Sequence, residues 1–401
     1  MKPPSKPFKR TVYVLGAGFS REANVPLQSE ILEAIRNLNL SDAPASLVNR
    51  YLTAWNNAST FLRNVFGLKT DPLLEDAFTL LDETISQKQY CCGYSWQTLE
   101  TINKSLNEVI LYLFHLKQKG ITNNAREFYN SFAAYCLEVF LKSQKSMEPI
   151  SIISLNWDCV LDNAFNWCLS KCVNIKTVVD YACYCTAIPE SEKRIYFQDS
   201  KYSNFKKFKL MKLHGSTNWS LCPNCGRVYT GLGMQENIWI KYILGTTCPK
   251  CSNFIPSSEG QEIRPPILES FLITPTFVKK FENPHIQMVW HIAYTELCEA
   301  ERVVFIGYSL READYRLRTL FKRAIRAGTD IEVVLAPCDK PKKKYQREKN
   351  IDGVTGRYKQ FFRSSDPMTF FYGGVKKYFQ KNAGSVTLKT RIRRLQRLAK
   401  E

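Results

Sequence analysis

Two glycines and a serine stand at the end of the first apolar run in the sequence. The run Thr-Val-Tyr-Val-Leu (11–15) leads directly into Gly16, Ala17, Gly18, Phe19 and Ser20. A strand that turns through Gly-x-Gly into a helix lets the backbone approach a pyrophosphate at the helix N-terminus. Position 21 is an arginine, whereas the pattern of hydride-transfer enzymes has a third glycine there. The loop therefore does not match the hydride-transfer enzymes, but it still favours a nucleotide-binding site. The alternative is a turn whose glycines are purely structural.

Polar side chains also follow two later apolar runs. Asn156 and Asp158 lie in Leu-Asn-Trp-Asp after the run 151–156, and His214 stands near the end of the run 208–215. An amide and a carboxylate suit the orientation of a water molecule or the binding of a nicotinamide nucleotide. A histidine at a strand end can act as a general base near neutral pH. The alternatives are a helix cap for Asp158 and a structural role for His214.

Four of the 14 cysteines form two closely spaced pairs. Each pair is Cys-x-x-Cys, which brings two thiolates to one ion, and two such pairs complete a tetrahedral zinc site. Four sulfur ligands leave no open position, so the sequence predicts a structural zinc ion rather than a catalytic one. The predicted ligands are Cys222, Cys225, Cys248 and Cys251.

Composition limits the class of protein. The chain has 401 residues and a formal net charge of +19. It has no run of about 18 apolar residues and no apolar segment behind its basic start, which predicts a cytoplasmic protein without a membrane span. Basic clusters at 206–212, 340–349 and the C-terminal tail favour a polyanionic partner such as nucleic acid, with a solvated basic surface as the alternative.

The elements that must position these residues follow from the apolar pattern. Short apolar runs, several of them separated by helical patterns, predict an α/β fold with a Rossmann-like doubly wound parallel sheet. Helical spacing fills about 40–145, including 73–85, and a further helix is expected over 310–328, closed by Gly328. In such sheets ligands bind beyond the carboxyl ends of the strands. The expected strands are 11–15, 151–156, 208–215, 270–275, 302–309 and 331–337.

Five motifs in this order resemble the sirtuin superfamily, specifically its sirtuin-like NAD-consuming branch. They are the glycine loop, Asn156-Trp157-Asp158, Lys212-Leu213-His214-Gly215, the four-cysteine ribbon and Gly307-Tyr308-Ser309-Leu310. The resemblance implies a Rossmann-type domain that binds NAD, with an inserted helical module and a small zinc-ribbon module. The implied division is a Rossmann domain in three parts (1–39, 146–220 and 257–375), a helical module (40–145), a zinc ribbon (221–256) and a basic C-terminal tail (376–401).

The resemblance also implies roles for individual residues. Asn156 and His214 become the catalytic pair, and Asp158 helps to hold the nicotinamide. The segment Gly16, Ala17, Gly18, Phe19 and Ser20 holds the pyrophosphate, and Gly307 and Ser309 line the adenosine side. Two departures bear on the acceptor: the chain has neither the Phe-Arg run nor the Phe-Gly-Glu stretch that accompany the peptide groove of deacylases.

These departures favour water as the acceptor. The leading hypothesis is an NAD+ glycohydrolase that releases nicotinamide and ADP-ribose, with a protein deacylase or ADP-ribosyltransferase as the alternative. A third hypothesis is a catalytically inactive module that binds a nucleotide or nucleic acid. The resemblance further implies a triggered anti-phage effector that depletes NAD, a homo-oligomer, and a partner ATPase of the DNA-translocating type.

Overall fold

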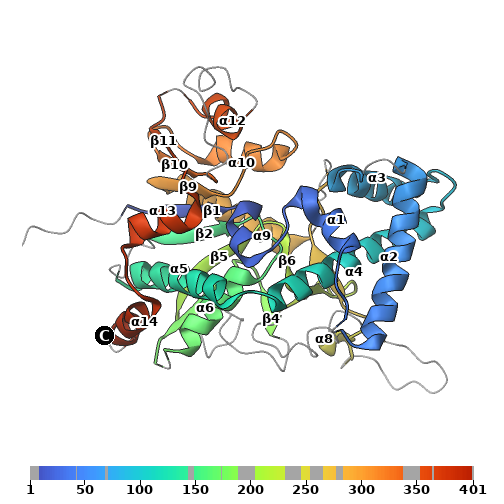
Figure 1. Cartoon of the computed structure of the whole chain (residues 1–401), viewed down its shortest axis with the longest axis horizontal. Coiled ribbons are helices and arrows are strands. Elements are labelled where there is room, and N and C mark those ends of the chain that lie inside the picture. Colours follow the sequence, from blue (N-terminus) through green and yellow to red (C-terminus); the bar gives the residue numbers. More distant parts are fainter. Residues whose placement is uncertain are drawn as a thin grey trace, which may run out of the picture.

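The computed structural model shows an α/β architecture built on one large parallel sheet (Figure 1). Its strands run in the order β11 (Met368–Phe371), β10 (Asp330–Val334), β9 (Arg302–Ile306), β1 (Thr11–Leu15), β2 (Ile150–Ser154), β5 (Lys206–Lys212) and β3 (Thr177–Asp180). All six neighbouring pairs are parallel, which confirms the predicted fold class. The structure describes residues 9–41, 43–67, 71–142, 149–172, 174–187, 204–230, 245–252, 265–276, 283–336, 353–363 and 365–399.

The sheet changes direction at β1. The chain moves from β1 to β2 and on toward β3 on one side, and later runs from β9 through β10 to β11 on the other. Such a switch point opens a crevice at the carboxyl ends of the strands, because the crossover connections leave in opposite directions. The strand β1 is buried along its whole length and pairs in register with both neighbours, Leu15 lying opposite Ser154 and Ile306.

The structure corrects one expected strand and adds strands that the sequence did not predict. The apolar run 270–275 contributes β8 (Glu269–Leu272), which lies in a second sheet and not in the parallel one. The edge strands β3 and β11 were not predicted. Both are four residues long, and only two or three of those residues are apolar, so the apolar signal is short.

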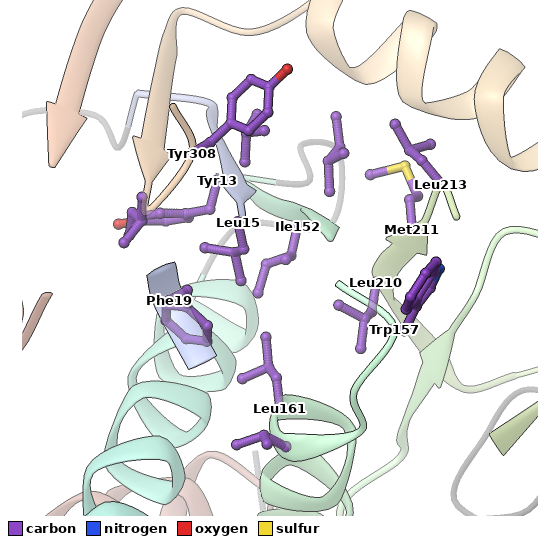
Figure 2. Close-up of a cluster of buried hydrophobic side chains, with 14 of the residues drawn as sticks. Tyr13, Leu15, Phe19, Ile152, Trp157, Leu161, Leu210, Met211, Leu213 and Tyr308 are labelled. Carbon is purple, nitrogen blue, oxygen red and sulfur yellow. The ribbon is translucent and has the colours of Figure 1, made fainter. Parts of the chain in front are cut away.

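Helices from distant parts of the chain cover the sheet. Helix α5 (Asn123–Lys142) contacts β2, α6 (Val160–Ser170), α13 (Gly374–Ala383) and α14 (Leu388–Leu398). Helix α9 (Pro284–Cys298) contacts β5 and α10 (Tyr315–Ala324), and α12 (Val354–Phe361) precedes β11. Figure 2 shows the core between sheet and helices, where Leu15, Ile152 and Leu161 meet.

The predicted helical region contains four helices with the expected buried faces. They are α2 (Ala45–Phe66), α3 (Leu74–Ser86), α4 (Trp96–Lys119) and α5, and the short α1 (Ile31–Arg36) precedes them. Helices α1, α2 and α3 pack on α4, at one end of the molecule (Figure 1). By contrast, α5 lies in the layer beside the large sheet, although it belongs to the same predicted region. The division into modules at residue 145 stays a prediction.

A second, four-stranded sheet follows the His214 segment directly. Its order is β4 (Cys185–Ala187), β7 (Val228–Thr230), β6 (Gly215–Leu221) and β8. Gly215 begins β6 with φ +70°, and a Cβ there would lie 2.2 Å from the Phe271 carbonyl oxygen. The chain therefore needs glycine at the point where it leaves one sheet and enters the other.

The described part of the C-terminal tail is helical. Thr387 caps α14 through a side-chain bond to the Thr390 amide, and the helix packs on α5. The basic cluster at 340–349 lies outside the described residues. Among the helices that the structure describes, none is long and apolar enough to cross a membrane.

Candidate functional site

A cavity of about 790 Å³ opens at the switch point of the large sheet. Its walls come from the ends of β1, β2, β5, β9 and β10, and the sequence predicted polar residues at the ends of the first four. The predicted site residues in its lining are Gly16, Ala17, Gly18, Asn156, His214, Gly307 and Ser309. The structure thus brings together residues that are up to 293 positions apart, as the predicted doubly wound fold requires.

The glycines of the first loop are required by close packing against the end of β9. A Cβ on Gly16 would lie 2.6 Å from the Gly307 carbonyl oxygen, and one on Gly18 would lie 2.8 Å from the Gly307 Cα. Gly307 itself has φ +64°, and its added Cβ would lie 2.3 Å from the Phe19 nitrogen. The Gly18 amide donates to the Gly307 carbonyl at 2.9 Å. The two glycines therefore allow the loop after β1 to pack against the loop after β9, and these two loops form one wall of the cavity.

The turn after the loop is a 3-10 helix, η1 (Ala17–Ala23). Phe19 lies among the buried hydrophobic side chains of the core (Figure 2) and does not line the cavity. Its ring centroid is 5.2 Å from that of Phe132 and 5.4 Å from that of Tyr129. Ser20 is 1% exposed and also does not line the cavity. Both side chains anchor the loop from behind, so any ligand contact in this segment comes from the backbone of residues 16–18.

The side chain of Asn156 is held by two hydrogen bonds. Its Nδ2 donates to the Gly16 carbonyl at 2.9 Å and to the Ser20 hydroxyl at 3.0 Å. An amide nitrogen carries two hydrogens, so both are used, and Oδ1 is the atom that Asn156 can offer a ligand. Asn156 therefore enters the cavity as a fixed acceptor that can face developing positive charge.

His214 lies at the end of β5, on the wall of the same cavity. Its Nδ1 lies 3.1 Å from the Leu155 carbonyl oxygen, which can only accept a hydrogen bond. Nδ1 therefore carries the proton, and the lone pair belongs to Nε2. This tautomer is the one in which a histidine can take a proton from a bound hydroxyl or water.

Asp158 is buried behind the cavity wall and is not part of its lining. Burial raises the pKa of the Asp158 carboxyl, and the charge of Lys212 and a hydrogen bond from Ser20 oppose that shift. Its Oδ1 accepts from the Val160 amide at 3.1 Å, at the first residue of α6. The N-cap position of α6 is Cys159, so Asp158 stands one residue before the cap that the sequence offered as an alternative, and its carboxylate closes a short turn to Val160. Asp158 has no direct contact with the cavity.

Several lining residues were missed by the sequence analysis. The expected helix over 310–328 is shorter, because α10 begins at Tyr315 and the residues before it form a cavity loop. In that loop Arg311 pairs with Glu75 at 2.9 Å, and Asp314 accepts from the Tyr308 hydroxyl at 3.0 Å. Gly328 lies in a turn before β10 with φ +84°. Helical spacing alone could not separate the loop from the helix that follows it.

The four predicted zinc ligands form one cluster in the small sheet. Their sulfur atoms all lie within 4.8 Å of one another, and Cys222–Cys251 and Cys225–Cys248 are separated by 3.7 and 3.8 Å. Four sulfurs at 2.3 Å from a zinc ion stand about 3.8 Å apart in a tetrahedron. The cluster therefore fits a structural zinc ion.

Neighbouring groups further prepare this cluster for a metal. The amides of Cys225 and Cys251 donate to the first sulfur of each pair, at 3.4 and 3.5 Å. Burial raises the pKa of Cys222 to about 12. Burial also acts to raise the pKa of Cys248, but hydrogen bonds from Tyr229 and the Cys251 amide outweigh it and lower that pKa to about 6. One thiolate thus forms readily, and the metal must supply the charge that stabilises the others.

Comparison with known proteins finds a distant likeness to one group of solved structures. No family model matches the chain, and no curated protein matches it. A Sir2–p53 peptide–NAD+ complex is similar with a TM-score of 0.39 at 11% identity, covering 94% of each chain. A Sir2 homologue–NAD complex has a TM-score of 0.39 at 11% identity, covering 98% of this chain and 91% of that one. Sir2Tm bound to a propionylated peptide has a TM-score of 0.36 at 12% identity, covering 94% of each.

Proposed function

We propose that the protein is a sirtuin-like NAD+ glycohydrolase, which cleaves the bond between nicotinamide and ribose. The observation that carries the proposal is the shared cavity of Asn156, His214 and the Gly16–Gly18 backbone at the switch point of the sheet. The motif order of the sequence supports NAD as the ligand, and the volume of about 790 Å³ is sufficient for a dinucleotide. In this proposal the pyrophosphate lies against the glycine loop and the adenosine beside Gly307 and Ser309.

The proposed reaction needs few protein groups. The C1′–N bond breaks, nicotinamide leaves with the electron pair, and the ribose acquires positive charge. Oδ1 of Asn156 is the acceptor that faces this charge, and Nε2 of His214 takes a proton from a ribose hydroxyl or the attacking water. Water adds at C1′, so that NAD+ and water give nicotinamide, ADP-ribose and one proton.

The direct test measures nicotinamide and ADP-ribose after incubation of the purified chain with NAD. We expect Asn156→Ala and His214→Ala each to lower turnover about a hundredfold or more. The matched controls are Asn163→Ala and His291→Ala, since both residues are exposed and lie outside the cavity lining. Equal loss in the controls, or unchanged turnover in the Asn156 and His214 variants, contradicts the proposal.

The acceptor separates this function from its main alternative. An acylated lysine peptide added to the same assay will leave the rate unchanged if water is the acceptor. Release of nicotinamide only in the presence of peptide, with acyl-ADP-ribose as product, supports a deacylase, and ADP-ribose attached to protein supports a transferase. The wider roles implied by the resemblance, a triggered anti-phage effector, a homo-oligomer and a partner ATPase, stay predictions.

The exposed face of α14 favours a second, binding function. Residues 388–398 contain no acidic side chain, and Lys389, Arg393 and Arg397 are exposed. Arg394 is also exposed, but it lies 3.8 Å from Glu138 of α5. The opposite face is anchored, since Leu395 is buried and Arg391 pairs with Glu138 of α5. A fixed helix that presents several cations to water suits the phosphate backbone of double-stranded DNA.

Salt dependence tests this second function. We expect the chain to bind a labelled DNA duplex, and Arg393→Gln and Arg397→Gln each to reduce the slope of log K against log salt by about one. Arg63→Gln on α2 is the control, because Arg63 is also exposed but lies on a different helix. Duplex binding that is independent of salt, or equally reduced by the control, contradicts the assignment.

A further inference from the structure

A buried ion pair that the proposed chemistry does not use lies behind the cavity. The Lys212 ammonium is 3.1 Å from Asp162 Oδ2, and the two side chains are 0% and 2% exposed. Removing two charges from water is costly, and apolar residues of similar volume often stabilise a fold equally well. The pair therefore calls for an explanation other than stability.

The contacts of Lys212 join the two segments that carry the candidate catalytic residues. Lys212 is the last residue of β5, two positions before His214. Its Nζ also donates to the backbone carbonyl of Asp158 at 2.5 Å, two positions after Asn156. One ammonium group thus binds the Asn156 turn to the His214 strand.

Sheet hydrogen bonding does not fix this turn by itself. The register of β2 and β5 ends with Ser154 opposite Lys212, and one more bond runs from the Leu213 amide to the Ser154 carbonyl. Beyond that point β5 leads into β6 of the small sheet. Asn156 and Asp158 therefore lie past the last paired residues of the large sheet. There the Thr217 amide of β6 donates to the Trp157 carbonyl at 2.9 Å, and Lys212 adds a side-chain link between the same two segments.

Further hydrogen bonds extend from both ends of the pair. Asp162 Oδ1 accepts from the Tyr181 hydroxyl at 2.6 Å, which orients the carboxylate toward Lys212. On the other side, Asp158 bonds with Ser20, and Ser20 accepts from Asn156 Nδ2. Hydrogen bonds thus lead from Tyr181 through Asp162 and Lys212 to the Asp158 backbone, and from the Asp158 side chain through Ser20 to Asn156.

We propose that Lys212 and Asp162 are positioning residues, which hold the Asn156 turn against the His214 strand so that both side chains face one ligand. This inference rests on the proposed function for its catalytic consequence, but its structural part does not. Neither residue lines the cavity, so neither contacts the ligand. Their effect is on the relative placement of Oδ1 of Asn156 and Nε2 of His214.

The test compares Lys212→Met, and the double variant Lys212→Met/Asp162→Leu, with a buried ion pair elsewhere. We expect both variants to lower kcat for NAD about ten- to hundredfold with little change in KM, because misplaced groups lose orientation while the cavity remains. The double variant removes both charges of the pair, although Asp158 still loses the nearby ammonium, so we expect it to recover part of the thermal stability but none of the kcat. If stability and kcat recover together, the pair is purely structural and the proposal is wrong.

Arg391→Met is the matched control. Arg391 and Glu138 are 1% and 5% exposed and join α14 to α5, remote from the cavity lining. Loss of this contact should lower the melting temperature and leave kcat unchanged. A fall in kcat equal to that of Lys212→Met shows that any buried break slows the enzyme, and it overturns the proposal.

Amide hydrogen exchange keeps the two proposals separate. In the double variant we expect faster exchange over 155–161 and 213–217, and no such change in Arg391→Met. This readout needs no turnover: if the wild-type chain does not cleave NAD, the proposed function fails while the positioning role is still measured. Unchanged exchange in both segments overturns the positioning role whatever the activity.

Discussion

The close approach of Gly307 to the first glycine loop allows a sharp test of residue geometry. We expect Gly307→Ala to lower the free energy of unfolding by about 3 kcal/mol or more, because strain at positive φ adds to a backbone clash. Gly328→Ala is the control: its φ is +84°, but its added Cβ meets nothing within 4 Å. There we expect only the strain, about 1 kcal/mol. Equal losses in urea unfolding of the two variants contradict the close packing.

Ionisation of Glu296 on α9 should make the free energy of unfolding depend on pH. The side chain is 2% exposed and lies 2.8 Å from Lys209 and 3.2 Å from Arg10. Burial acts to raise the pKa of Glu296, but Lys209 and then Arg10 hold it below its ordinary value. A folded-state pKa below the unfolded one means that the ionised group stabilises the fold above about pH 4.3, and that this stabilisation is lost on acidification.

We therefore expect Glu296→Gln to lower the free energy of unfolding at pH 7 by about 2 kcal/mol. The difference from wild type should shrink on acidification, as the pH falls through the lowered pKa of Glu296 and the wild-type carboxylate also takes up a proton. Glu299→Gln serves as the control, since Glu299 pairs with the same Arg10 but is 47% exposed and should change stability by about 0.5 kcal/mol or less. A Glu296→Gln deficit that persists unchanged at low pH contradicts the assignment.

At the residue scale, the side chains that directly follow a strand could be predicted from the sequence. Asn156 and His214 belong to this group, because strand ends are recognisable from the apolar runs before them. Phe19 and Ser20 share the same motif, yet their side chains turn into the core, which a linear pattern does not reveal. Arg311 lines the cavity from a loop whose composition is typical of a helix, so the sequence did not identify it as a site residue.

Among the elements, the central strands were predictable and the edges were not. Strands buried on both faces need continuous apolar runs, and β1, β2 and β9 have them. The run that became β8 has the same composition but pairs antiparallel with β6, through Ser270 and Ser220. Apolar content marks a strand, whereas its sheet is decided by contacts far away in the chain.

The zinc cluster makes a prediction about the small sheet as an element. We expect about one zinc ion per purified chain, and Cys222→Ser to lose it and to lower the melting temperature, because metal binding contributes directly to folding of such sites. Cys91→Ser is the control, since Cys91 lies outside the cluster. Elemental analysis and thermal unfolding measure both effects. A chain that contains no zinc, or a Cys222→Ser variant that retains it, contradicts the site.

On the scale of the whole molecule, the cavity depends on parts of the chain that fold into different layers. Its wall joins the β1 loop, the β2 turn, the β5 end and the β9 loop, and Arg311 ties that last loop to Glu75 of α3. Two hydrogen bonds connect the helices α3 and α4 to the segments of the small sheet. Gln118 of α4 donates to Thr217 of β6, and Thr274, which follows β8, donates to Asp82 of α3. We therefore expect a ligand in the cavity to affect all of these parts together.

This coupling predicts how NAD changes the stability of the molecule. The His214→Ala variant is the suitable protein, because we expect it to bind NAD without consuming it. At a ligand concentration of 100 Kd, binding should add about 2.7 kcal/mol to the free energy of unfolding. Hydrogen exchange should slow together at residues 16–22, 155–158 and 307–311, since the proposed function has one dinucleotide in contact with all three segments. Protection of a single segment means that the ligand does not span the cavity, and a site shared by distant strands is then the wrong description.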